Sequence, residues 1–141
     1  MNMEQLSNFP AAARQLMGGS RVWEKYGMTL SSGQALLLAQ QQADALRASG
    51  RVDFGGGILK KLADAFCDSP YLQPADWCGT LAQLTGLFYE LKNETRDRLG
   101  DDALIAAMAA RFNGEAGGSP EVLADTEPAW FLRFAAEGGR P

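Results

Sequence analysis

The sequence predicts an all-α protein, an irregular single-domain helical bundle of about five main helices with additional short helical turns. Three observations support this fold class. Apolar residues recur at spacings of three and four, most helix-like segments begin at a capping residue or a proline and end at glycine, and strand-like alternation hardly occurs. A chain of 141 residues also fits one domain, with enough apolar surface to fold without a metal or a disulfide.

The first expected helices are short. One follows Pro10 and ends at Gly18-Gly19, because proline is favoured at helix starts and glycine at helix ends. The next is expected to be capped by Ser20 and to stop at Gly27.

The middle of the chain alternates long helical segments with one break. Ser31 and Gln34 have the spacing of a capping box and predict a helix as far as Gly50. Segment 51–57, RVDFGGG, resists helix formation because its three glycines accept almost any backbone angle. Segment 58–67 then places its apolar residues on one helical face.

The longest helix is expected between Pro74 and Gly100, on a continuous apolar stripe. A further helix starts at Asp101-Asp102, whose carboxylates suit the positive end of the helix dipole, and short helical turns open at Ser119-Pro120 and Pro128. The residues predicted to form the core are Ile58, Leu62, Phe66, Trp77, Leu81, Leu84, Phe88, Leu91, Leu104 and Met108.

Composition excludes several function classes. The chain has no histidine, which removes Ser-His-Asp and Cys-His nucleophile pairs and the commonest metal ligand, so no catalytic residue, metal or cofactor is expected. A net charge of -4 disfavours nucleic-acid binding. No export signal or membrane-spanning run is expected, and two cysteines are too few for a secreted disulfide scaffold, so we expect a cytoplasmic protein.

Three local patterns have a structural and a functional interpretation. Gly55-Gly56-Gly57 precedes a helix, as in anion-binding loops, but lacks the Walker spacing, so a flexible turn is favoured. The residues Glu90, Asn93, Glu94 and Asp97 share one helical face, which we interpret as solvated. Cys67 and Cys78 fall outside the main apolar arcs and are interpreted as ordinary thiols, with the Cys67 pKa raised by its helix C-terminus and Asp68.

One constellation depends on an assumed tertiary arrangement. If segment 58–67 and the following helix form an antiparallel hairpin, a rise of 1.5 Å per residue places Ile58 level with about residue 86. Segment 51–54 then lies near residues 88–94. The predicted polar patch consists of Arg51, Asp53, Lys92, Asn93 and Glu94.

Within this patch, Lys92 lies at the edge of an apolar face and is expected to contact Asp53 or another carboxylate outside its own helix. A network that fastens segment 51–54 to the hairpin is favoured over a ligand site.

The chain also contains, in order, the segments KYGMTLS (25–31), GRVDFGGGI (50–58), AFCDSPY (65–71), LFYELKNE (87–94), DDALIAAM (101–108) and GSPEVLA (118–124). With these segments it resembles one of the uncharacterised bacterial domain-of-unknown-function families. The resemblance covers about residues 20–125 and implies a small helical bacterial protein with no assigned activity. Cys78 departs from the small residue expected there, so the resemblance does not imply a Cys67–Cys78 disulfide.

The predicted organisation is one helical domain over residues 1–141, with a short N-terminal helix in 1–19, the family-like core in 20–125, and a helical turn and tail in 126–141. Two functions remain open. The first is a non-catalytic accessory or protein-interaction module with an unidentified protein partner. The alternative is a small-ligand-binding or weakly enzymatic domain that uses the polar patch. The two differ in whether the patch side chains converge on a pocket or are consumed by one another.

Overall fold

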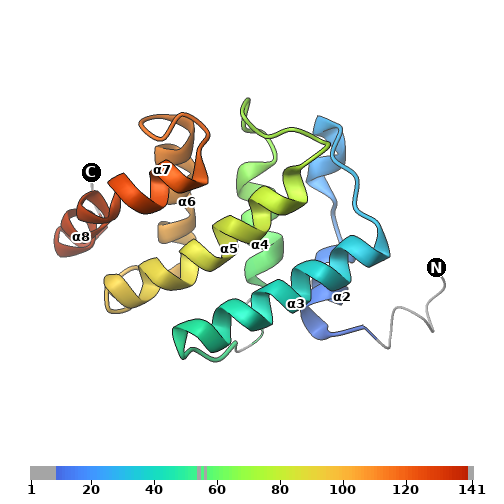
Figure 1. The fold of residues 1–141 in the computed structure, drawn as a ribbon, viewed down its shortest axis with the longest axis horizontal. Coiled ribbons are helices and arrows are strands. Elements are labelled where there is room, and N and C mark those ends of the chain that lie inside the picture. The colour runs from blue at the N-terminus through green and yellow to red at the C-terminus, as the bar shows by residue number, and fades with distance from the viewer. Residues whose placement is uncertain (1–8, 54, 56, 140–141) are drawn as a thin grey trace.

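The computed structural model describes residues 9–53, 55 and 57–139, and within these it is helical with no strand (Figure 1). The all-α prediction is therefore confirmed. The two longest helices have 18 residues each. The elements are α2 (Ala11–Met17), a 3-10 helix η1 (Val22–Tyr26), α3 (Ser32–Ser49), α4 (Ile58–Phe66), α5 (Trp77–Glu94), α6 (Asp101–Asn113), α7 (Pro120–Thr126) and α8 (Pro128–Ala136).

Helices α3 and α5 run side by side in the same direction (Figure 1). Near the start of both, the Trp77 indole Nε1–H donates to the Thr29 carbonyl oxygen at 2.9 Å, across 48 residues of sequence. Near the ends of both, Asn93 Nδ2–H donates to the Ser49 carbonyl oxygen at 3.0 Å, across 44 residues. The nearly constant separation in sequence shows that the pair is parallel, so both C-termini lie at the same end of the molecule.

The antiparallel hairpin assumed between segment 58–67 and the following helix is not present. Helix α4 crosses behind α5 (Figure 1), and α3 is the neighbour that follows α5 along its length. Hydrogen bonds from α5 side chains to the α3 region favour this parallel packing, which no local pattern in segment 58–67 encodes. The start of α4 still comes close to Lys92, so segment 51–53 lies beside α5 as expected.

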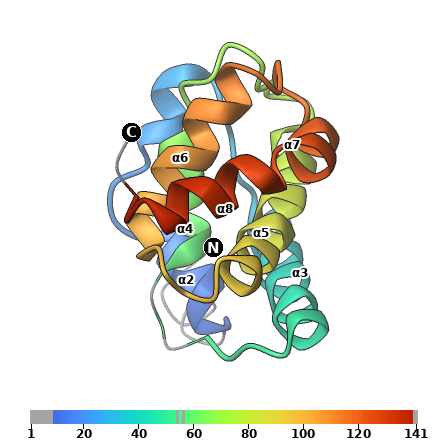
Figure 2. The ribbon, with the colours of Figure 1, turned by 90° about the vertical axis from the view of Figure 1, so that its left-hand side faces the viewer.

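The remaining helices extend the bundle past α5. Helix α7 packs on α5 and α6, and α8 packs on α5 and α7 (Figure 2). None of the helices in the described part of the chain is long and apolar enough to cross a lipid bilayer.

All ten predicted core residues are buried. Large side chains from the flanking elements complete the core, among them Trp23, Phe112 and Phe131. Cys67 is also buried, so its expected position outside the apolar arc was wrong. Cys67 keeps helical backbone angles, and it is buried because the buried face of α4 is wider than predicted and also includes Ala63.

Several element boundaries differ from the prediction. The segment after Ser20 is a 3-10 helix whose N-cap is Arg21, so Ser20 does not cap it. The capping box of Ser31 and Gln34 is present with both hydrogen bonds. Helix α5 is shorter than expected at both ends. Just beyond its C-terminus, Arg96 and Asp97 form a left-handed turn, which is part of the site described next.

Candidate functional site

Arg51 is the first residue after the left-handed glycine that ends α3, and its guanidinium reaches across to the end of α5. Its Nη2 lies 2.6 Å from Asp97 Oδ1 and its Nη1 lies 3.1 Å from Oδ2, a two-pronged pair. The same Nη1 donates to Asn93 Oδ1 at 2.9 Å. The hydrogen bond from Arg51 lowers the pKa of Asp97, and the pair raises the pKa of Arg51.

Asp97 occupies this position because helix α5 has already ended. Arg96 and Asp97 have φ values of 53° and 57°, in the left-handed region that non-glycine residues rarely adopt. The Asp97 N–H donates to the Lys92 carbonyl at 2.9 Å, which closes the turn. The turn directs Asp97 toward Arg51, so Asp97 is exposed as predicted but lies outside the helix that was expected to contain it. Glu90 and Glu94, still helical, are exposed as expected.

Lys92 is buried on α5, and the exposed fraction of its side chain is 9%. Its ammonium donates to the Leu99 carbonyl oxygen at 2.9 Å and pairs with Asp101 Oδ1 at 2.9 Å. Asp97 Oδ1 lies 3.6 Å away. The expected carboxylate from outside its helix is therefore present, but among the described residues Asp53 is not one of its ion-pair partners.

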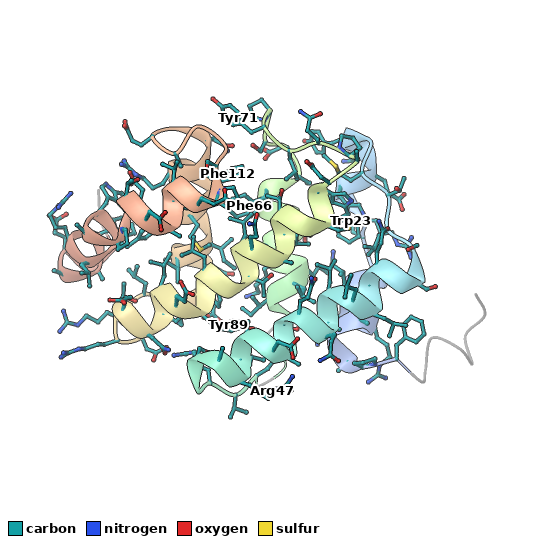
Figure 3. The ribbon with its side chains drawn as sticks, in the orientation of Figure 1. Trp23, Arg47, Phe66, Tyr71, Tyr89 and Phe112 are labelled. Atoms are coloured by element: carbon teal, nitrogen blue, oxygen red, sulfur yellow. The ribbon has the colours of Figure 1, made fainter. Side chains whose placement is uncertain are left out.

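A small cavity of about 160 Å³ lies between these charges and the core. Its lining residues are Arg51, Val52, Asp53, Ile58, Phe88, Tyr89, Lys92 and Asp101. Tyr89 lies between α5 and α3 (Figure 3), where its hydroxyl accepts a 2.9 Å hydrogen bond from Gln42. Burial raises the pKa of Tyr89, and the nearby carboxylates of Asp53 and Asp101 raise it further.

The five residues of the predicted patch thus line two different hollows, although Arg51 also donates a hydrogen bond to Asn93. Arg51, Asp53 and Lys92 line the cavity. Asn93 and Glu94 line a separate hollow between α3 and α5. The division arises because successive residues on a helix point in different directions, about 100° apart.

That second hollow belongs to a longer furrow over the outward face of α5. On one side of α5, a hollow of about 240 Å³ is lined by Ala45, Ala48, Ser49, Gly86, Glu90, Asn93 and Glu94. On the other side, a hollow of about 240 Å³ is lined by Ala82, Gln83, Gly86, Leu87, Glu90, Pro120, Glu121 and Ala124. Both include Gly86 and Glu90, so the two hollows adjoin on α5 at these residues, and we call the two together the furrow.

The glycine-rich turn before α4 borders a wider cleft, of about 640 Å³. Gly57 has a φ of 68° and forms the N-cap of α4, and Gly56 lies outside the described residues. The two lysines of the cleft are already paired, Lys60 with the Ser20 carbonyl and Asp64, and Lys61 with Asp102.

Sequence reasoning missed Asp97 and Asp101 as members of the charged network. The signal for Asp101 was present, since it is an acidic residue at the start of the next helix, and an ammonium at the edge of an apolar face needs a carboxylate partner. The signal for Asp97 was misleading, because a continuous helix places it on the opposite side.

The described residues contain no group of three or more His, Cys, Asp or Glu side chains placed to hold a metal ion. Both cysteines are free thiols, Cys67 buried and Cys78 half-buried. Burial raises the pKa of each, and for Cys67 the carboxylates of Asp68 and Asp64 add to the effect. Burial is the larger cause for Cys67, ahead of the neighbouring charge on which the sequence argument relied.

The fold and the site together define a small all-α bundle in which an ion-paired network joins the ends of α3, α5 and α6. Residues 15–137 match the family of unknown function DUF6323, and the chain belongs to that family. The match extends beyond residues 20–125 and includes α8. No curated protein and no solved structure matches the chain significantly.

Proposed function

We propose that this protein is a non-catalytic accessory protein of the bacterial cytoplasm that binds another protein through the furrow over α5. The observation that carries the proposal is Gly86, in the interior of α5. A glycine in a helix interior costs about 0.5–1 kcal/mol of stability relative to alanine. Outside its own helix, no described atom lies within 4 Å of the place where a Cβ on Gly86 would be. Packing within the chain therefore does not explain the glycine, whereas close approach of a partner backbone does.

The furrow also has a defined charge. Its carboxylates are Glu90, Glu94 and Glu121, and its lining contains no lysine or arginine in the described part of the chain. Hydrogen bonds from its own backbone, from Gln83 and from Ser119 lower the pKa of Glu121, which favours its ionised form. The partner segment expected there is a positively charged peptide or helix with small side chains facing Gly86, and the carboxylates disfavour a nucleic acid.

Site-specific photocross-linking in the cells that make the protein tests this function. A photoreactive phenylalanine analogue at Ala48, an exposed residue of the furrow, is expected to capture a discrete protein partner. The same analogue at Ala106, exposed on α6 and outside both hollows, serves as the matched control.

Substitution of Gly86 by leucine fills the furrow without changing charge, and we expect it to abolish the cross-link from position 48 while leaving the fold intact. Capture of a partner from position 106 and not from position 48 would show that the interface lies on another face of the protein. Absence of a cross-linked partner from both positions contradicts the proposed function.

The proposed cytoplasmic location rests on the two free thiols, which suit a reducing compartment. Cell fractionation with antibody detection checks it, and recovery in a periplasmic or secreted fraction contradicts it.

A further inference from the structure

The cavity beside segment 51–53 has the size of a very small ligand. Its volume is about 160 Å³. A protein cavity of about 150 Å³ accommodates benzene, so the space here suits a molecule of about six heavy atoms. Drug-sized molecules and nucleotides need pockets of at least about 300 Å³ and do not fit.

The charged side of the cavity is not fully neutralised. The positive charges of Arg51 and Lys92 are balanced by Asp97 and Asp101, with distances of 2.6 Å and 2.9 Å. Asp53 is exposed, and its one hydrogen bond from the described residues comes from the Gly55 N–H in its own loop, at 3.1 Å. The two cations, Arg51 and Lys92, are thus outnumbered by the three carboxylates of Asp53, Asp97 and Asp101. One net negative charge remains, and it is located at Asp53.

The opposite side of the cavity is apolar and firmly held. Ile58, Phe88 and Tyr89 are buried, and the two aromatic rings pack edge to face with centroids 5.1 Å apart. The raised pKa of Tyr89 agrees with a negative potential at this wall, because the carboxylates of Asp53 and Asp101 contribute to it after burial. Aromatic rings and a carboxylate together form the surroundings that attract an ammonium group with an attached hydrocarbon.

We propose that this cavity binds a small primary ammonium compound with an aliphatic body. The ammonium group pairs with the carboxylate of Asp53, and the hydrocarbon lies against Ile58, Phe88 and Tyr89. This inference goes beyond the proposed protein-binding function and does not depend on it, because the furrow is lined by other residues.

Nuclear magnetic resonance titration with n-pentylamine tests the proposal. We expect saturable shifts of the Val52 and Ile58 methyl signals at ligand concentrations up to about 10 mM, the range expected for a ligand of this size. The matched probes are 1-pentanol, which has the same length without charge, and pentanoate, which has the opposite charge. Both are expected to bind more weakly than the amine.

Asp53→Asn is the variant that separates a site from general attraction to an acidic protein. Asp53 has no ion pair within the described residues, so the variant is expected to fold normally by circular dichroism. It should weaken amine binding by up to about fivefold, the upper end of the effect of an exposed charge pair.

Glu94→Gln removes an exposed carboxylate outside the cavity and should leave amine binding unchanged. Equal binding of amine and pentanoate, equal losses in the two variants, or no saturable shift with the amine would each overturn the proposal.

Discussion

Arg51 and Asp97 are 46 residues apart in sequence, and their side chains form a two-pronged ion pair that joins the end of α3 to the turn after α5. The pair exists because two chain reversals meet: Gly50 ends α3 in the left-handed conformation, and Arg96 and Asp97 adopt the same region after α5. We interpret this ion pair as the interaction that holds segment 51–53 over the cavity.

Asp97→Asn is expected to lower the free energy of unfolding by about 0.5–1 kcal/mol at neutral pH, because the carboxylate is half exposed and solvent screens the pair. Folding lowers the pKa of Asp97 below its ordinary value of 3.8. The ion pair therefore contributes its full stabilisation above pH 3.8, and this contribution is lost as the pH falls through the lower pKa of the folded state. Urea unfolding of both proteins between pH 7 and pH 2.5 checks this. A stability difference that grows toward acid would contradict the assignment.

A double-mutant cycle identifies the partner of Lys92. Lys92→Met and Asp101→Asn are each expected to cost about 1–3 kcal/mol, because each leaves a buried or partly buried charge without its partner. Since the two groups contact each other, their effects should be non-additive by at least about 1 kcal/mol.

The control cycle pairs Lys92→Met with Asp53→Asn, for which we expect additivity within about 0.5 kcal/mol. Chemical denaturation supplies all the values. A stronger coupling to Asp53 than to Asp101 would show that Asp53 is the main partner of Lys92.

Two glycines are expected to respond to alanine in opposite directions. At Gly86 a Cβ meets open space, so Gly86→Ala should stabilise the protein by about 0.5–1 kcal/mol. At Gly118, φ is 82° and a Cβ would lie 2.3 Å from Cβ and Cγ of Tyr71. These atoms are near the Tyr71 backbone and cannot swing away, so Gly118→Ala should cost about 2 kcal/mol or more.

Thermal unfolding followed by circular dichroism measures both changes. Destabilisation by Gly86→Ala would remove the main argument for the furrow, because it would show that the glycine serves the fold itself.

Folding is expected to need neither a metal nor a disulfide, so EDTA and dithiothreitol should leave the melting temperature unchanged. Both thiols should react slowly with iodoacetamide at neutral pH, since their pKa values are raised and the thiolate is the reactive form. Mass spectrometry is expected to find Cys78 modified before Cys67, which is buried. A drop in melting temperature with dithiothreitol would reveal a stabilising disulfide.

The helices and their inward faces were determined locally. The Ser31–Gln34 capping box, the proline at the start of α8 and the apolar stripe from Trp77 to Leu91 act over a few residues, and such short-range effects can be read from sequence spacing. For this reason every residue predicted to be in the core is buried.

The partners of those helices, and therefore the candidate site, were decided by tertiary structure. The spacing of apolar residues around Leu91 does not indicate whether α3 or α4 lies alongside α5. The left-handed turn at Arg96 and Asp97 ends the helix at a point where the sequence pattern predicts that it continues. Contacts across more than forty residues then paired Asp97 with Arg51, and they left Asp53 at the cavity without an ion pair to any residue that the structure describes. The sequence by itself determined which side chains are available for a charged network, and the packing of α3 against α5 decided which of them meet, because pairing requires proximity in space that no local signal encodes.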